Sequence, residues 1–359
     1  MTEGSCVALG LMSGTSMDGI DAALLRSDGE RILEIGPTLA VSYDADFRDQ
    51  LRGVIGEQTA KDVDGVAAEL TLRHAAAVRQ LLEISGDGFP RPELIGFHGH
   101  TVFHRPEAGI THQIGDGTLL AAETGIPVVA DFRSMDVAAG GEGAPLAPLF
   151  HTALSADLEK PLAVLNVGGV ANVTWIGQGG EVLAFDTGPG NAMIDDWVKA
   201  ATGLPMDRGG QLARSGWVNS DALQQLMNND YFGRRPPKSL DRNDFSMQDV
   251  AALSPADGAA TLSAFSATAV AKAAEFFPSP AKRWLVCGGG RHNATLMHMF
   301  EEGLRAPVDP VEAVGWDGDF LEAQAFAFLA IRSAKGLALS LPTTTGVRSP
   351  QTGGTLFQP

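Results

Sequence analysis

A repeated pattern of two apolar runs joined by a glycine-rich turn constrains this chain more than any other feature. In the first copy, residues 6–11 and 20–25 flank a turn of small, hydroxyl and acidic residues. In the second copy, residues 162–167 and 170–176 flank a pair of glycines. Short apolar runs bounded by turn residues are typical of buried strands, and glycine lets the backbone N–H groups of a turn approach an anion closely. Both segments are therefore predicted to be β-hairpins that can hold phosphate.

Two further elements accompany the hairpins. Asp186 ends a predicted strand over 182–186 and precedes a Thr-Gly-Pro-Gly turn, and a predicted strand over 284–287 runs into a glycine triplet followed by a helix over 294–304. One glycine cluster alone is equally typical of an ordinary tight turn. Three clusters in this order, with a carboxylate after the second, favour nucleotide-dependent phosphoryl transfer, because that chemistry relies on positioning and charge neutralisation by backbone donors and Mg²⁺.

The composition narrows the class of protein. A chain of 359 residues exceeds the size at which a single core usually keeps growing, so two domains are expected. Lys and Arg total 26 against 43 Asp and Glu, and the formal charge of −17 argues against nonspecific binding to nucleic acid or anionic lipid. No apolar run is long enough for a membrane span, no secretion signal is recognised, and the two cysteines are expected to be buried thiols. We expect a cytoplasmic protein.

Alternating strands and helices indicate an α/β architecture. The spacing of apolar residues predicts helices over 63–82, 117–124, 192–202 and 255–277, and strands over 94–97 and 128–130. The glycine-rich residues 138–145 are predicted to form a hinge or a site loop. Residues 203–249 are dense in Gly, Pro, Asn and Arg and are predicted to form an insertion with little regular structure. The second half of the chain repeats the order of the first, as a duplicated unit would.

The residues of five sequence motifs indicate a resemblance to a known family. Residues 10–19, 97–102, 143–146, 185–191 and 288–293 carry it. The order of these motifs resembles that in the superfamily of actin, sugar kinases and heat-shock chaperones. Their residues resemble those of the anhydro-N-acetylmuramic acid kinase family, and the resemblance covers nearly the whole chain. The resemblance implies two actin-like, ribonuclease H-like α/β domains with a nucleotide and substrate cleft between them. We expect the first domain at 1–135, with 340–359 packed on it, and the second at 136–339.

The family's activity implies ATP and Mg²⁺ as cofactors and a small amino sugar as substrate, and a homodimer is compatible with it. The ATP contacts expected in the first hairpin are Ser13, Gly14, Thr15, Ser16, Met17, Asp18 and Gly19. Those expected in the second half are Asn166, Gly168, Gly169, Gly288, Gly289, Gly290 and Asn293. The magnesium ligands stay open, because Mg²⁺ keeps most of its waters and needs few protein ligands. Asp18 and Asp21 are also typical turn or cap residues.

Asp186 is the predicted general base, since a carboxylate beside a phosphate site can take a proton from an attacking oxygen. An Asx-turn with the residues that follow it is the structural alternative. In this family the base activates water, because the anhydro sugar has no free 6-hydroxyl. The resemblance places His98, Gly99 and Thr101 at the sugar, on a loop after the strand 94–97, while His100 stands where the family usually has Gln.

Arg133 is a candidate for holding a sugar carboxylate, and an Asp131–Arg133 interaction is the alternative. Glu322 matches a family position near the sugar and is equally typical of a helix start. The histidines at 98, 100, 104 and 112 also permit a zinc site, although no cysteine or carboxylate partners accompany them.

Overall fold

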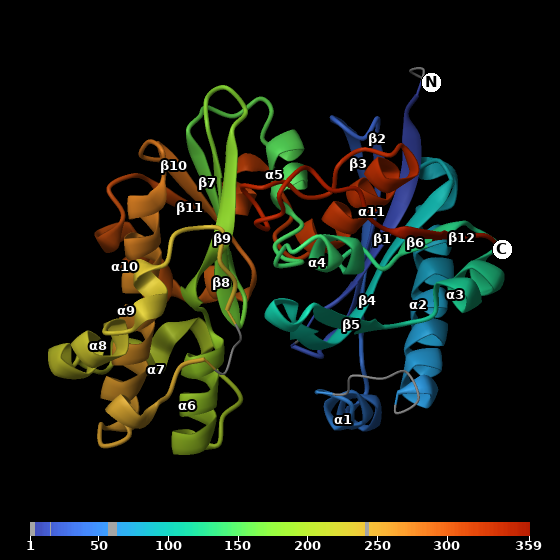
Figure 1. The fold of residues 1–359 in the computed structure, drawn as a ribbon. Helices are drawn as coiled ribbons and strands as arrows, with labels where there is room; N and C mark the ends of the chain where they lie inside the picture. The colour runs from blue at the N-terminus through green and yellow to red at the C-terminus, as the bar shows by residue number, and fades with distance from the viewer. Residues whose placement is uncertain (1–3, 15, 57–62, 241–243) are drawn as a thin grey trace. The chain divides into compact units, whose positions relative to one another are not determined.

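The computed structural model describes residues 4–14, 16–56, 63–240 and 244–359, and the chain divides into two compact units. Met1–Asp157 and Phe320–Pro359 form the first unit, and Leu158–Asp319 form the second. Each unit is a sheet flanked by helices (Figure 1). The two units are described separately below.

The boundaries of these units differ from those expected from the sequence. Residues 136–157 and 320–339 were expected in the second domain, whereas they belong to the first unit. The reason is packing: helix α11 (Leu321–Ala334) lies against strands of the first sheet, and α5 (Pro148–Leu154) lies against α11. Residues 340–359 also belong to the first unit, as expected.

The first sheet has the strand order β12-β6-β4-β1-β2-β3. Strands β1 (Cys6–Ser13), β2 (Gly19–Ser27) and β3 (Ile32–Ser42) are antiparallel neighbours, and β4 (Leu94–Arg105) and β6 (Val128–Ala130) extend the sheet in parallel with β1. Strands β5 (Ile110–Ile114) and β12 (Thr355–Phe357) pair with β4 and β6. The predicted hairpin at 6–25 is confirmed, whereas sequence reasoning missed β3, β5 and helix α1 (Ala45–Gly53).

The second sheet repeats this order as β11-β10-β7-β8-β9. Strands β7 (Leu162–Val167), β8 (Val170–Ile176) and β9 (Val182–Pro189) form the antiparallel set, and β10 (Arg283–Cys287) and β11 (Val308–Pro310) follow in parallel with β7. In each unit a three-stranded antiparallel meander therefore continues into parallel strands. This shared topology confirms the α/β class and the duplicated unit.

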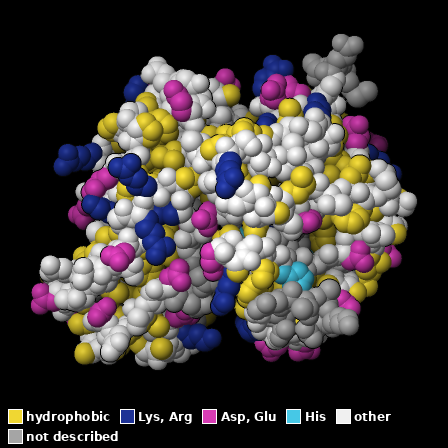
Figure 2. Space-filling model, viewed as in Figure 1, with side chains coloured by type: hydrophobic (Ala, Val, Ile, Leu, Met, Phe, Trp, Pro, Cys, Tyr) yellow, Lys and Arg dark blue, Asp and Glu magenta, His cyan; other side chains and the backbone are white. Residues whose placement is uncertain are grey.

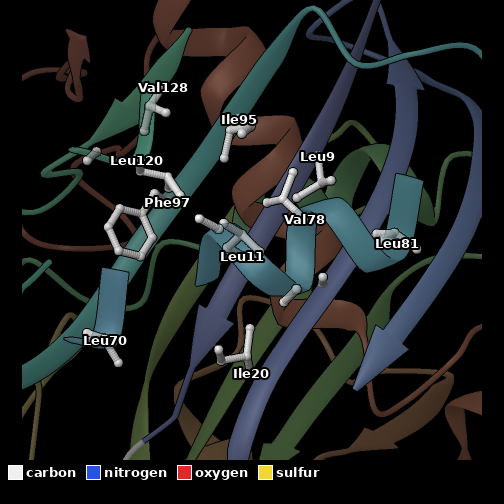
Figure 3. Close-up of a cluster of buried hydrophobic side chains, with 14 of the residues drawn as sticks. Leu9, Leu11, Ile20, Leu70, Val78, Leu81, Ile95, Phe97, Leu120 and Val128 are labelled. Carbon is white, nitrogen blue, oxygen red and sulfur yellow. The ribbon is translucent and has the colours of Figure 1, made fainter. Parts of the chain in front are cut away.

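Helices cover both faces of the first sheet, because successive side chains of a strand point to opposite faces and both faces carry apolar or small residues. Leu9 and Leu11 point toward α2 (Asp64–Ser85), where Leu70 and Val78 complete a buried cluster (Figure 3). Gly10, between the two leucines, faces α11 on the other side. A Cβ atom at Gly10 would lie 1.8 Å from the carbonyl oxygen of Ala323, so only glycine lets the helix backbone approach the strand this closely. The remaining helices of this unit are α3 (Gly117–Thr124) and α4 (Ser134–Ala138).

The second unit contains α6 (Ala192–Thr202), α7 (Gln211–Arg214), α8 (Ser220–Met227), α9 (Pro255–Ala273) and α10 (Ala294–Gly303). Ser254 caps α9, with its hydroxyl accepting from the backbone N–H of Asp257. The segment 203–249 is more regular than expected, because it holds α7, α8 and short 3-10 turns at Arg208–Gly210, Asp230–Gly233 and Gln248–Val250. Its apolar residues, including Tyr231 and Phe232, pack with α6 and α9 in a core of their own.

Among the described residues, no helix combines the length and the apolar character needed to cross a membrane. Acidic and basic side chains are interspersed on the viewed face of each unit (Figure 2). Cys287 is buried and Cys6 is half-buried, and neither is part of a disulfide.

Candidate active site

The turn of the first hairpin is held at its base by backbone hydrogen bonds. The N–H of Met17 donates to the carbonyl of Gly14, and the N–H of Tyr43 donates to the carbonyl of Asp18. Met17 adopts a positive φ of 56°, and the exposed Ser16 hydroxyl donates to the Asp18 carboxylate at 2.8 Å. A Cβ atom at Gly14 would meet only the Ser16 hydroxyl, at 3.5 Å, so the backbone there is open to a ligand. The predicted contact Thr15 lies outside the described residues.

Ser13 faces the interior rather than the turn surface. Its side chain is buried, and its hydroxyl accepts from the Tyr43 hydroxyl at 2.8 Å and lies 3.0 Å from Nδ1 of His100. Burial raises the pKa of Tyr43 above its usual value and lowers that of His100 to about 4, so both groups are neutral near pH 7. Any phosphate contact of Ser13 would therefore come from its backbone, while its side chain links β1 to Tyr43, the residue after β3, and to His100 in β4.

In the second unit, the predicted phosphate-binding turn between β7 and β8 lies beside the end of β9. The carbonyl oxygens of Gly168 and Gly169 accept hydrogen bonds from the backbone N–H groups of Asn191 and Gly190, at 2.7 and 2.9 Å. These bonds place the β7–β8 turn at the N-terminus of α6. A Cβ atom at Gly168 or Gly169 would meet its nearest neighbour at 3.5 Å, so neither glycine is enclosed by other atoms. Helix N-termini and exposed turn N–H groups are favourable places for phosphate.

The glycine triplet lies directly beside this turn. Gly288 has a φ of +73°, and a Cβ atom there would lie 2.3 Å from Oδ1 of Asn166, so the two predicted nucleotide elements are in contact. Arg291 braces the triplet from behind: its guanidinium donates to the Gly288 carbonyl at 3.0 Å and forms ion pairs with Glu312 and Asp319. Asn293 uses Oδ1 to cap α10 at the N–H of Leu296.

Asp186 lies within β9, which continues to Pro189 rather than ending at Asp186 as predicted. The register with β8 shifts here, because Asn172 pairs with Asp186 and Ala171 pairs with Gly188. Such bulges redirect a side chain and are frequent beside active sites. One carboxylate oxygen, Oδ2, accepts from the backbone N–H of Leu240 at 2.9 Å, 54 residues further along the chain. The half-buried carboxylate is thus oriented by a distant segment.

His98 and Arg133 form the centre of the predicted sugar site in the first unit. Both Nε and Nη2 of Arg133 donate to Nε2 of His98, at 3.2 and 3.0 Å, and Nη1 donates to the carbonyl of Gly143 at 2.8 Å. Nδ1 of His98 donates to the carbonyl of Gly99. Burial, followed by the positive charge of Arg133, lowers the pKa of His98 well below its usual value, so the imidazole is neutral and accepts from Arg133.

The other predicted sugar residues lie on the same elements. Residues 98–101 belong to β4 and not to a loop, because β5 pairs with β4 from His100 onward and lengthens the strand. Thr101 accepts from the Gln113 side chain at 3.3 Å, and Glu322 is exposed in the first turn of α11. Asp131 accepts from the hydroxyl of Ser134. Within the described residues, no group of three or more His, Cys, Asp or Glu side chains is arranged to hold a metal ion.

A family model for anhydro-N-acetylmuramic acid kinase matches residues 6–359. The chain belongs to this family. A relative named anhydro-N-acetylmuramic acid kinase from Rhodospirillum rubrum is 56% identical over 360 residues, covering 99% of this chain and 95% of the relative. Another of the same name, from Paramagnetospirillum magneticum, is 56% identical over 351 residues, covering 97% and 98%. The resemblance carried by the five motifs is therefore confirmed.

Solved structures with a related outline are much more distant. A ROK family glucokinase from Streptomyces griseus, in complex with glucose and AMPPNP, is 14% identical with a TM-score of 0.43 and covers 90% of this chain and 99% of that one. The component A of an Acidaminococcus fermentans (R)-2-hydroxyglutaryl-CoA dehydratase is 13% identical with a TM-score of 0.44, covering 92% and 99%.

Sequence reasoning did not predict the contacts that hold the predicted site residues in place. Tyr43 supports Ser13, Gly143 supports Arg133, and Leu240 supports Asp186. Two of these three contacts are made by backbone groups, which any residue type can supply. Gly143 lies in two segments that the sequence singled out, the glycine-rich residues 138–145 and the family motif at 143–146, but neither predicted its contact with Arg133.

Proposed function

We propose that this chain is an ATP-dependent kinase that opens the 1,6-anhydro ring of 1,6-anhydro-N-acetylmuramic acid with water and phosphorylates the released 6-oxygen. The products would be N-acetylmuramic acid 6-phosphate and ADP. Family membership over residues 6–359 supports the substrate. The observation that carries the mechanism is Asp186, a half-buried carboxylate at a strand bulge with one oxygen fixed by the Leu240 N–H.

Asp186 is proposed as the base of a coupled reaction. It takes a proton from water, and the water oxygen bonds to the anomeric carbon as the bond from that carbon to the 6-oxygen breaks. The electron pair of the broken bond stays on the 6-oxygen, which attacks the γ-phosphorus of ATP, and ADP leaves. A positioned carboxylate base contributes roughly 10² to 10⁴ in rate, and fixing Oδ2 restricts the carboxylate to one orientation.

The two glycine hairpins are proposed to hold the phosphates of ATP. The open backbone at Gly14, Gly168 and Gly169 suits this role, because no other backbone lies within 3.4 Å of the position of an added Cβ atom. Mg²⁺, when bound, neutralises phosphate charge. The residues present fit such an ion, since Mg²⁺ uses phosphate oxygens, waters and one or two carboxylates, and the exposed Asp18 offers one beside the first turn.

Arg133 and His98 are proposed to recognise the sugar. The guanidinium is fixed in one orientation by Gly143 and by the neutral His98 imidazole, and a fixed guanidinium is well suited to a carboxylate such as the lactyl group of muramic acid. Gly99, Thr101 and Glu322 are proposed as further sugar contacts on the same unit. The reaction would belong to recycling of the cell wall in the cytoplasm.

A coupled ADP-release assay with a panel of anhydro and reducing amino sugars tests the substrate. Running the productive reaction in oxygen-18 water should place the label on the anomeric carbon and leave the transferred phosphate unlabelled. Label in the phosphate would mean that ATP is merely hydrolysed. Equal activity on reducing sugars would instead indicate a conventional sugar kinase.

The variant Asp186→Asn tests the base. It keeps the shape of the side chain and an oxygen for the Leu240 N–H but lacks the proton acceptor, so kcat should fall by roughly two to four orders of magnitude while both substrates still bind. Asp221→Asn, at an exposed Asp in the first turn of α8, is the matched control. Wild-type turnover in Asp186→Asn would require a different base.

A further inference from the structure

We propose that Lys238 is a positioning residue for Asp186: it holds the segment that orients the carboxylate and keeps that carboxylate ionised. This inference rests on the proposed role of Asp186 as a base. It gives a function to part of the segment 203–249, whose composition suggested only an irregular insertion.

Three hydrogen bonds attach this segment to Asp186. The N–H of Asp186 donates to the carbonyl of Lys238 at 3.0 Å, and the N–H of Leu240 donates to the Asp186 carboxylate at 2.9 Å. The hydroxyl of Tyr231 donates to the carbonyl of Asp186 at 2.6 Å. The backbone and the side chain of Asp186 are therefore both held by hydrogen bonds to residues 231–240.

The Lys238 side chain ties the two ends of this segment together. Its Nζ donates to the carbonyl of Tyr231 at 2.9 Å and lies 4.3 Å from the centre of the Tyr231 ring. The rings of Phe276 and Phe185 lie 5.0 and 5.8 Å from the same atom. An ammonium among aromatic faces is stabilised by their quadrupoles, and it holds the rings in return. Only 6% of Lys238 is exposed, so water has little access to the ammonium and does not replace these contacts.

Lys238 also acts on Asp186 through its charge. Burial lowers the pKa of Lys238 to about 8, Arg234 lowers it as well, and the negative charge of Asp186 acts in the opposite direction. Glu275, on the turn that also carries Phe276, is paired with Lys272 at 2.6 Å. Lys238 is thus charged at and below neutral pH, and its positive charge favours the ionised form of Asp186.

Removing the charge should therefore change kcat and its pH dependence together. In Lys238→Met, the segment loses its hydrogen bond to Tyr231, and Asp186 binds a proton more readily. We expect kcat to fall roughly tenfold, KM for ATP to change little, and the acidic limb of the kcat–pH profile to move to higher pH. Lys238→Arg, which keeps a positive charge, should leave the limb at its wild-type position.

Two further variants separate alignment from charge. Tyr231→Phe removes only the hydroxyl that donates to Asp186, so kcat should fall without a shift of the limb. Lys272→Met removes an exposed lysine of the same unit and should match the wild type in both respects. If Lys238→Met does not yield folded protein, Lys238→Gln serves in the same comparison, because it is also uncharged but keeps a donor.

A direct titration makes the test independent of turnover. The ionisation of Asp186 can be followed by carbon-13 NMR of the aspartate carboxyl carbons, with Asp186→Asn identifying the resonance. A midpoint at higher pH in Lys238→Met than in wild type supports the proposal, and an unchanged midpoint with unchanged kcat overturns it. Wild-type protein that is inactive on the anhydro sugar would instead count against the proposed function, and the NMR comparison would still decide the role of Lys238.

Discussion

Acid should destabilise the first unit through its buried histidines. His74, His98, His100 and His151 are all buried, and burial is the largest cause of a lowered pKa in each. The pKa is about 4 for His74, His100 and His151, against 6.5 for an unperturbed histidine. As the pH falls from 6.5 toward 4, the unfolded chain binds protons that the folded unit does not. Stability is thus fully present above pH 6.5 and is lost progressively below it.

The size of the effect follows from these values. Between pH 7 and pH 5, a histidine whose pKa moves from 6.5 to 4 on folding loses about 2 kcal/mol of stabilisation, and three such histidines lose about 6 kcal/mol. Near pH 5 these three histidines together contribute a slope of about 4 kcal/mol per pH unit, and the lowered pKa of His98 acts in the same direction. A typical domain is stable by only about 5–15 kcal/mol.

Urea unfolding at pH 7, 6, 5.5 and 5 would measure this slope. Far-UV circular dichroism follows both units, whereas tryptophan fluorescence follows the second alone, because all five tryptophans lie within 158–319. The second unit has only His292 and His298, whose side chains are 67% and 68% exposed, so it serves as an internal reference. The variant His74→Leu should lower the slope by the contribution of that one histidine, slightly less than one proton or about 1 kcal/mol per pH unit. A wild-type slope below that of one proton between pH 6 and pH 5 would refute the argument.

Three further results are expected. Gly10→Ala should destabilise the first unit by about 1–3 kcal/mol or more, because the added Cβ would clash with the α11 backbone. The control Gly65→Ala, whose Cβ would meet nothing within 4 Å, should not destabilise it, and the urea midpoints of the two variants test this difference. A non-hydrolysable ATP analogue with Mg²⁺ should raise Tm, by an amount equivalent to about 2.7 kcal/mol at 100 times Kd, and no shift at saturation would count against the nucleotide site. Arg133→Ala should raise KM for the sugar far more than KM for ATP; the exposed Arg79→Ala is its control, and an unchanged sugar KM would make Arg133 structural.

Local patterns in the sequence determined much of the secondary structure. The bounds of α3, β6 and α6 agree with those expected from apolar spacing, and α9 begins at Pro255 as expected. These features depend on residues only a few positions apart, so the sequence contains the whole of their cause. Glycine turns and apolar runs likewise predicted both hairpins, and the motif wording identified the family.

Only the tertiary structure decided how the site residues are held. The pairing of His98 with Arg133 joins residues 35 positions apart, and the bond from Leu240 to Asp186 joins residues 54 apart through a backbone N–H that every residue but proline possesses. The sequence could not assign α11 to the first unit either, because its fit depends on the absence of side chains at Gly10 and Gly96 on two other strands. Residue identity encodes local conformation directly, whereas these long-range contacts depend on how completed elements pack together.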